Sequence, residues 1–254
     1  MKIIGGSSSS GKISIFSDQF VAIARSSRRG VITCEVTRRP VVSNFLSRHK
    51  YLPMPLLVKM LLRLIEDFTK KQWLFIGLFA FLIYGIGPIL RNIYPPRPDA
   101  VTYKALGPCL WILNAAFIVY VLTYMRRYIA TWHGAEHMAI AAYERNGSTS
   151  IEQIAQECPV NDQCGGRFSA PIIMAILTSV FVSESIGVNQ TVVCLMFLEC
   201  ILWVDRLIGF EKIPITSHLS HLLQKYITTQ KPGTQELLTA QQALLGLIAA
   251  HENI

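Results

Sequence analysis

The chain has 254 residues, of which 51% are hydrophobic and 16% are charged, and its formal net charge is +8. An average soluble domain carries about 25% charged residues, so this composition argues against an ordinary soluble domain. The basic residues flank uncharged stretches and do not form one basic patch. This distribution favours an anionic membrane surface over nucleic acid, and we expect no nucleic-acid partner.

The first fifty residues predict a small β-rich module in the cytoplasm. Residues 12–16 alternate between apolar and polar side chains, and residues 20–24 and 30–36 are short β-rich runs. The segment 5–11 reads GGSSSSG, which predicts a loop. This loop lacks the GxxxxGK[ST] spacing of a phosphate-binding loop.

An amphipathic helix is predicted next, within residues 51–72. Its apolar side chains fall at helical spacing, and charged side chains lie between them. Such a helix lies on the membrane surface or packs against the cytoplasmic module, and the sequence does not choose between these two.

Four apolar stretches follow that predict transmembrane helices. Residues 73–90 and 105–125 contain no Asp, Glu, Lys or Arg, and an uncharged run of about 18 residues is long enough to cross the hydrocarbon layer. Residues 168–183 are uncharged, and residues 187–204 carry only Glu199; with the short polar link between them they predict a tight transmembrane hairpin. The proline-rich residues 91–104 form the predicted outer loop.

These segments predict a mainly α, polytopic helical membrane protein with about four transmembrane helices in residues 73–208. Basic residues are scarce in the predicted outer loop, so the positive-inside rule places residues 126–167 and both termini in the cytoplasm. The expected localisation is the cell (inner) membrane, with the lipid bilayer as a partner. Residues 209–254 predict a cytoplasmic helical tail, with an amphipathic helix at 235–251 after a Pro-Gly-Thr start signal.

The strongest chemical motif is WHGAEH at residues 132–137. On a helix, His133 and His137 lie one turn apart on one face, so both imidazoles can bind one metal ion. Together with Glu136 they form the H-x-x-E-H pattern of inverted zinc hydrolases, in which the glutamate is the general base. The alternative is a pair of interfacial histidines with no metal.

A catalytic zinc site needs a third protein ligand and an open position for water. Glu199 is the predicted third ligand, because an ionisable residue within an apolar span is costly and is therefore expected to be functional. The alternative is a polar contact between Glu199 and Arg206 or Asn114. Further candidates near the metal, or for contact with substrate, are Tyr143, Glu144, Asp162 and Cys164.

Several of these segments carry a resemblance to a known family. They are HGAEH at 133–137, AYE at 142–144, CG at 164–165, LE at 198–199, the tail LQ through TT to P at 223–232, and GG at 5–6. They resemble the YqhQ-like family of bacterial membrane proteins, also called domain of unknown function 1385. The resemblance implies a multi-pass membrane protein with a predicted metal-dependent activity. The chain departs from the family pattern at Met138, where a lysine is usual, and in the serine-rich stretch after Gly6.

The function expected from these features is metal-dependent hydrolysis, with a divalent metal, zinc in our interpretation, at the cytoplasmic membrane interface. The expected substrate is membrane-associated, either a peptide or a lipid-linked molecule. The alternative is a non-enzymatic membrane scaffold that binds a cytoplasmic protein partner or a second copy of itself. A metal-ion carrier is disfavoured, because Glu199 and Asn114 are nearly the only polar groups in the predicted spans.

Overall fold

The computed structural model describes residues 1–27, 29–39, 55–59, 62, 112, 116, 119–161, 164 and 168–253. The chain divides into two compact units, one made of Met1–Lys59 with Leu122–Ile254 and the other of Met60–Val121. Most of the second unit lies outside the described residues. The fold and the candidate site described below therefore belong to the first unit.

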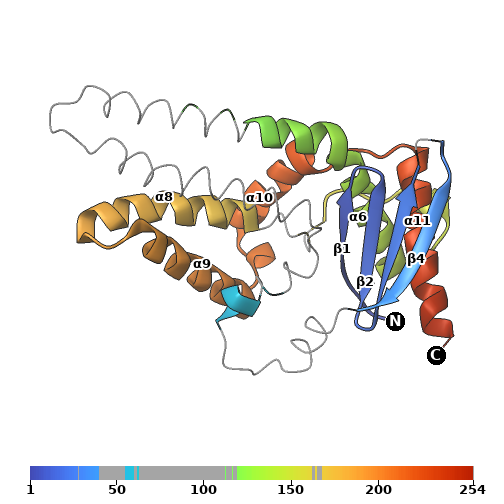
Figure 1. Ribbon diagram of the computed structural model, residues 1–254, viewed down its shortest axis with the longest axis horizontal. Helices are drawn as coiled ribbons and strands as arrows, with labels where there is room; N and C mark the ends of the chain where they lie inside the picture. Colours follow the sequence, from blue (N-terminus) through green and yellow to red (C-terminus); the bar gives the residue numbers. More distant parts are fainter. Residues whose placement is uncertain are drawn as a thin grey trace, which may run out of the picture. The chain divides into compact units, whose positions relative to one another are not determined.

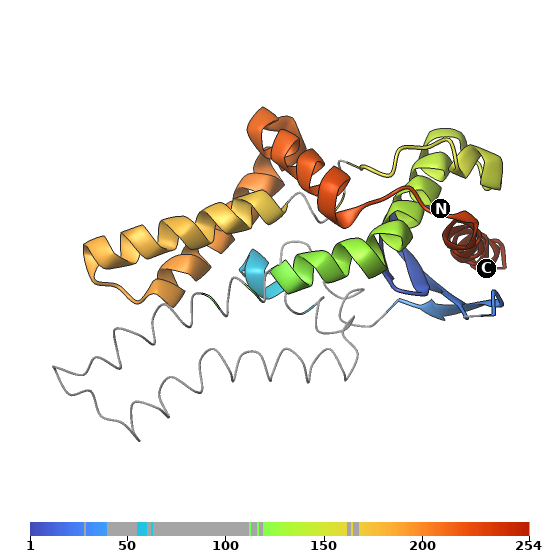
Figure 2. The same ribbon diagram turned by 90° about the horizontal axis from the view of Figure 1, so that it is seen from above.

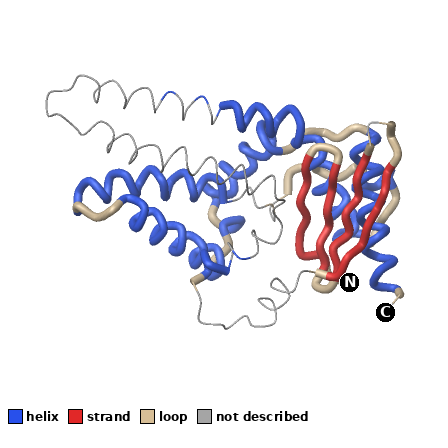
Figure 3. Tube along the Cα trace, in the orientation of Figure 1, coloured by secondary structure: helices blue, strands red, loops and turns tan. Residues whose placement is uncertain are grey.

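An antiparallel four-stranded sheet is formed by β1 (Ile3–Ser9), β2 (Lys12–Ser17), β3 (Phe20–Ser26) and β4 (Ile32–Arg38), in that spatial order. Figures 1 and 3 show the strands side by side in chain order. On one face, large residues of β2 oppose small residues of β3, with Ile13 paired to Ala24 and Ile15 to Ala22. All four of these side chains are fully buried. This complementary pairing gives the sheet a flat apolar face that a helix can cover.

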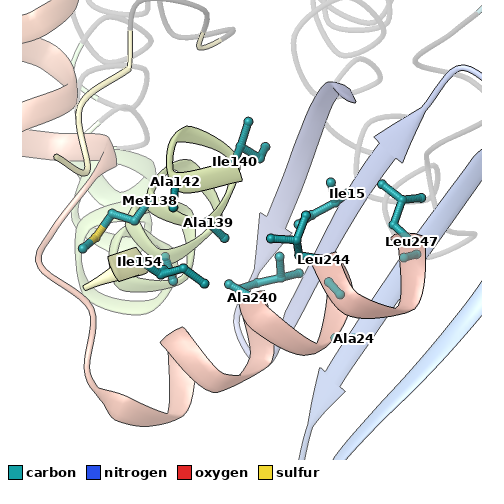
Figure 4. Packing of buried hydrophobic residues seen from close by; sticks show 14 of the residues in the cluster. Ile15, Ala24, Met138, Ala139, Ile140, Ala142, Ile154, Ala240, Leu244 and Leu247 are labelled. Atoms are coloured by element: carbon teal, nitrogen blue, oxygen red, sulfur yellow. The ribbon is translucent and has the colours of Figure 1, made fainter. Parts of the chain in front are cut away.

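Two helices cover that face. α6 (Ala130–Asn146) lies against β1 and β2, and α11 (Thr234–Glu252) lies across β2, β3 and β4. Figure 2 shows the same layers from above. Ala240 and Leu244 of α11 meet Ala139 and Ile140 of α6 and the sheet in one hydrophobic core, shown in Figure 4. The N-terminal strands therefore share their core with helices from the middle and the end of the chain.

The remaining described elements connect or extend this core. A π-helical turn, Met125–Ile129, runs directly into α6, and Gly233 is the N-cap residue of α11. α8 (Ser169–Ile186) and α9 (Gln190–Leu207) form a helical hairpin whose turn contains Gly187 in the left-handed conformation. The other elements are α7 (Ile151–Ile154), the 3-10 turn Phe210–Lys212, α10 (Pro214–Leu223) and the π-helical turn Gln224–Thr228.

The prediction of a polytopic membrane protein is wrong for the part of the chain that the structure describes. None of the helices there is long and apolar enough to cross a membrane. α8 and α9 have 18 residues each, or about 27 Å at 1.5 Å per residue, against a hydrocarbon layer of about 30 Å. The multi-pass inner-membrane localisation rested on these spans and is corrected with them. The predicted span at 73–90 and the loop at 91–104 lie outside the described residues, as does most of 105–125.

Two local predictions have different outcomes. The prediction of a loop at 5–11, made from its glycines and serines, is wrong, because most of this segment lies in β1. The amphipathic helix predicted at 235–251 is confirmed as α11. Of the helix predicted between residues 51 and 72, only 55–59 and 62 are described, and residues 56–59 are helical.

Candidate metal centre

α6 places His133 and His137 one turn apart on the helix face that meets β1, as their spacing predicts. The ring centroids lie 4.3 Å apart, with the rings nearly perpendicular at 76°. The helix ends at Gly147, whose backbone N–H bonds to the Ala142 and Tyr143 carbonyls, so the histidines sit well inside a capped helix.

Cys164 supplies a third donor to this pair. Its Sγ lies 3.3 Å from Nε2 of His133, and the ligand atoms of His133, His137 and Cys164 all lie within 4.8 Å of one another. Zinc binds imidazole nitrogen at about 2.0–2.1 Å and thiolate sulfur at about 2.3 Å, so the two atoms of a tetrahedral site are about 3.6 Å apart. The His133–Cys164 separation is close to that value. The predicted metal site is therefore confirmed at the level of a group of side chains that could hold an ion.

The surroundings fix the state of the two imidazoles. Nδ1 of His137 lies 2.7 Å from the Pro159 carbonyl oxygen, which can only accept a hydrogen bond. Nδ1 therefore donates, and Nε2 of the neutral ring keeps its lone pair. Burial and, to a lesser extent, the neighbouring His137 together lower the pKa of His133 to about 3. Burial also lowers the pKa of His137, opposed by its bond to Pro159. Both rings are neutral at neutral pH, as metal ligands must be.

Glu136 lies beside these donors and is almost completely buried. Its side chain is 3% exposed, and its Oε2 atom has no hydrogen-bond partner among the described residues. Burial raises the pKa of its carboxyl group to about 8, and the Ser8 hydroxyl opposes this without forming a well-directed hydrogen bond. A buried acceptor without a partner costs free energy, and this makes Glu136 a candidate functional residue.

Gly6 of β1 makes room for that carboxylate. A Cβ atom at this position would lie 2.8 Å from Cδ of Glu136 and would also collide with Oε1. Any larger residue at position 6 would displace the acid or the strand. β1 and α6 can therefore approach each other closely at Gly6, because glycine has no side chain.

A cavity of about 280 Å³ joins these groups. It is lined from the sheet by Ile4, Gly5, Gly6 and Phe16, from α6 by His133, Glu136, His137, Ile140 and Glu144, and from the following segment by Asn161 and Cys164. Its size lies just below the range of about 300–1,000 Å³ typical of ligand pockets. Ligand pockets combine apolar walls with a few converging polar groups, and the lining of this cavity is more polar than is usual.

The structure does not bring Glu199 to the histidines. Its carboxylate accepts the backbone N–H groups of Leu56 and Leu57 at 2.7 and 2.8 Å, and the Trp203 indole N–H at 3.0 Å. Burial raises the pKa of Glu199, but these donors outweigh that effect and lower it. Among the described residues, the group that could hold an ion contains Cys164 and not Glu199 beside the two histidines.

The other predicted residues have separate outcomes. Glu144 lines the cavity, and Tyr143 packs, half-buried, against the hydrophobic core. Asp162 lies outside the described residues. Two contributors were not predicted, namely Gly6 and the Pro159 carbonyl, and the Gly-Gly pair at 5–6 is the one sequence signal that points to the first of them.

Comparisons with known proteins agree with the resemblance of the motifs. The pattern of the family described as "Protein of unknown function (DUF1385)" matches residues 76–249, which include both histidines, Glu136 and Cys164. A curated relative, "Uncharacterized protein YqhQ" of Bacillus subtilis (strain 168), is 19% identical over 187 residues. That alignment covers 67% of this chain and 58% of the relative, so the chain spans somewhat over half of its relative's length. No solved structure matches the chain significantly.

Proposed function

The chain belongs to the DUF1385 family, and from the chemistry of its site we propose that it is a metal-dependent hydrolase with zinc as its metal. The observation that carries this proposal is the convergence of His133, His137 and Cys164 on one cavity, beside the buried acid Glu136. Imidazole and thiolate together suit zinc, whereas magnesium and calcium prefer oxygen ligands.

The number of donors favours catalysis over a structural role. Structural zinc sites are closed by four protein ligands, whereas catalytic sites keep one position open. The described residues offer three ligands, and the cavity adjoins them. A zinc ion held there would polarise a substrate carbonyl and make water more acidic.

Glu136 is the proposed general base. It lines the same cavity as the three donors, and its Oε2 atom lacks a partner within the described residues, so it can accept a proton from water there. Burial raises the pKa of its carboxyl group to about 8, so the ionised form, which accepts the proton, is a stronger base than an ordinary carboxylate. His137 would be held in the metal-binding orientation by the Pro159 carbonyl, a contact of the type that supports metal ligands elsewhere.

The rival hypothesis of a scaffold has less support. It assigned partner binding to the β-rich module and the C-terminal helix. In the structure these two elements bury their apolar faces against each other in one core. A scaffold function also does not explain why Glu136 is buried with an oxygen atom that lacks a hydrogen-bond partner among the described residues.

The test uses hydrolysis of p-nitrophenyl acetate by the purified, zinc-loaded full chain. Glu136→Gln should lower kcat/KM about 10²–10⁴-fold, the usual contribution of a general base, while the zinc content stays unchanged. Glu199→Gln is the matched control and should keep the wild-type rate. The proposal fails if Glu136→Gln retains full activity, or if removing zinc leaves the rate of the wild type unchanged.

A further inference from the structure

One edge of the sheet adjoins the metal centre and has no partner strand in the described part of the chain. β1 pairs with β2 on one side, and no described segment forms a ladder with its other side. Residues of this same strand, Ile4, Gly5 and Gly6, line the cavity that holds the three donors. An open edge presents backbone N–H and C=O groups that another extended chain can pair with.

The two edges of the sheet differ in how they are protected. β4, the opposite edge, carries Glu35 and Arg38, and charged side chains are a common device against unwanted pairing. β1 reads IIGGSSS, with no charge and no proline. The edge beside the metal centre is therefore the one whose side chains do not discourage an added strand.

The pairing of β1 is irregular at the residues that line the cavity. The pairing with β2 shifts register between Ile3 and Gly5, which leaves Ile4 as an extra residue, and Ile4 is 43% exposed. Bulges of this kind occur at sheet edges next to active sites. At Gly5, φ is +147° and a Cβ would meet open space, so the backbone is accessible to a ligand there.

Two buried polar atoms at this junction face each other but make no well-directed hydrogen bond within the described residues. They are Oε2 of Glu136, from α6, and Oγ of Ser8, from β1. Both atoms can accept hydrogen bonds, so a ligand that carries N–H donors would satisfy them. A polypeptide carries such donors along its whole length, whereas a lipid chain carries none.

The residues of α6 that line the cavity are spread along the helix. They reach from His133 to Glu144, about 16 Å of helix at 1.5 Å per residue. An extended chain rises about 3.3 Å per residue, so this length corresponds to roughly five residues. The enclosed volume, about 280 Å³, is small, and the rest of such a chain would lie outside it along the strand edge.

We propose that the substrate is an extended polypeptide that adds to the free edge of β1 as a further strand, which places one of its peptide bonds at His133, His137 and Cys164. Strand addition supplies main-chain hydrogen bonds, and the cavity accommodates the side chains next to the reacting bond. In the reaction, water oxygen bonds to the carbonyl carbon and the C–N bond breaks. Glu136 accepts one proton from the water and passes it to the leaving amine, and the products are a carboxylic acid and an amine.

This inference rests on the proposed hydrolase function but is tested through binding. The probe is β-casein, an unfolded polypeptide, added to zinc-loaded Glu136→Gln protein, which should bind without turnover. Hydrogen exchange of those amides at 4–9 that point away from β2 should slow about tenfold when the probe is added, as expected for amides that gain ladder hydrogen bonds. The amides at 32–38, in the opposite edge strand, are the internal control and should not change.

The outcomes separate the two proposals. Unchanged exchange at 4–9, or equal protection of both edges, would overturn strand addition. If wild type hydrolyses p-nitrophenyl acetate but leaves β-casein unbound and intact, the substrate class is wrong while the hydrolase function stands. If β-casein protects 4–9 but neither substrate is hydrolysed, the hydrolase function is wrong and the polypeptide site remains.

Discussion

Two glutamates, Glu199 of α9 and Glu136 of α6, differ in their hydrogen bonds and in the direction in which their pKa values are shifted. Glu199, in the α8–α9 hairpin, accepts three hydrogen bonds, from two backbone N–H groups and one indole, and its pKa is lowered. Glu136, between α6 and β1, is 3% exposed, has an oxygen with no partner among the described residues, and has a pKa raised to about 8. The hydrogen bonds of Glu199 account for its place in the fold, whereas Glu136 is buried without such bonds and is therefore the candidate for a reaction or a ligand.

The largest expected effect separates the metal donors from Glu199. Replacing His133 and His137 together by alanine should remove bound zinc, because Cys164 alone cannot hold it. The loss of affinity should exceed the roughly 10–100-fold cost of losing only a residue that supports a ligand. Equilibrium dialysis followed by elemental analysis measures this, with Glu199→Gln as the control that keeps its zinc. Full retention of zinc by the double variant would contradict the site.

An intermediate effect is expected at the contact between the acid and the sheet. In Gly6→Ala, the new Cβ would press on the Glu136 carboxylate and move it from its place beside the donors. We expect hydrolysis of p-nitrophenyl acetate to fall about 10–100-fold, since displacements near 1 Å cost this much, while zinc remains bound. Ser7→Ala alters the exposed neighbour on the same strand and should retain the wild-type rate. Equal rates for the two variants would show that Gly6 does not position Glu136.

The smallest effect concerns Glu199 and is one of stability. Glu199→Gln weakens the hydrogen bonds to the Leu56 and Leu57 amides and should lower the free energy of unfolding by about 1 kcal/mol at pH 7, as for other lost helix caps. The pKa of Glu199 is lowered in the fold, so its contribution is present above its unfolded value of 4.5 and is lost as the pH falls through the folded value. Urea denaturation at pH 7 and pH 4 should show the difference between wild type and variant shrinking at the lower pH. A constant difference would assign the effect to something other than charge.

The parts of the site that are local in sequence could be predicted. Two histidines four residues apart, with a glutamate between them, define one helix face whatever the fold, and α6 bears this out. Cys164 was named among several candidates, but its contact with His133 joins residues 31 apart. That contact depends on the path of the chain after α6, which no periodicity encodes.

Other features were mispredicted because composition has more than one structural solution. The GGSSSSG segment is typical of loops, yet it becomes a strand because β2 supplies a complete ladder to it. Glu199 was predicted to be a metal ligand because an acid in an apolar helix is costly. Its carboxylate instead accepts hydrogen bonds from backbone N–H groups of residues that lie 142 and 143 positions away. Apolar helices of 18 residues resemble membrane spans in sequence, although no described helix meets the length and apolarity that a span requires.

The identity of the third ligand tests the central claim most directly. X-ray absorption at the zinc edge of the loaded full chain distinguishes sulfur, at about 2.3 Å, from the nitrogen and oxygen ligands at about 2.0–2.2 Å. The structure predicts one sulfur together with two imidazole nitrogens, and Cys164→Ser should remove the sulfur signal while Glu199→Gln leaves the spectrum unchanged. A spectrum without sulfur that changes in Glu199→Gln would contradict this account and return Glu199 to the metal.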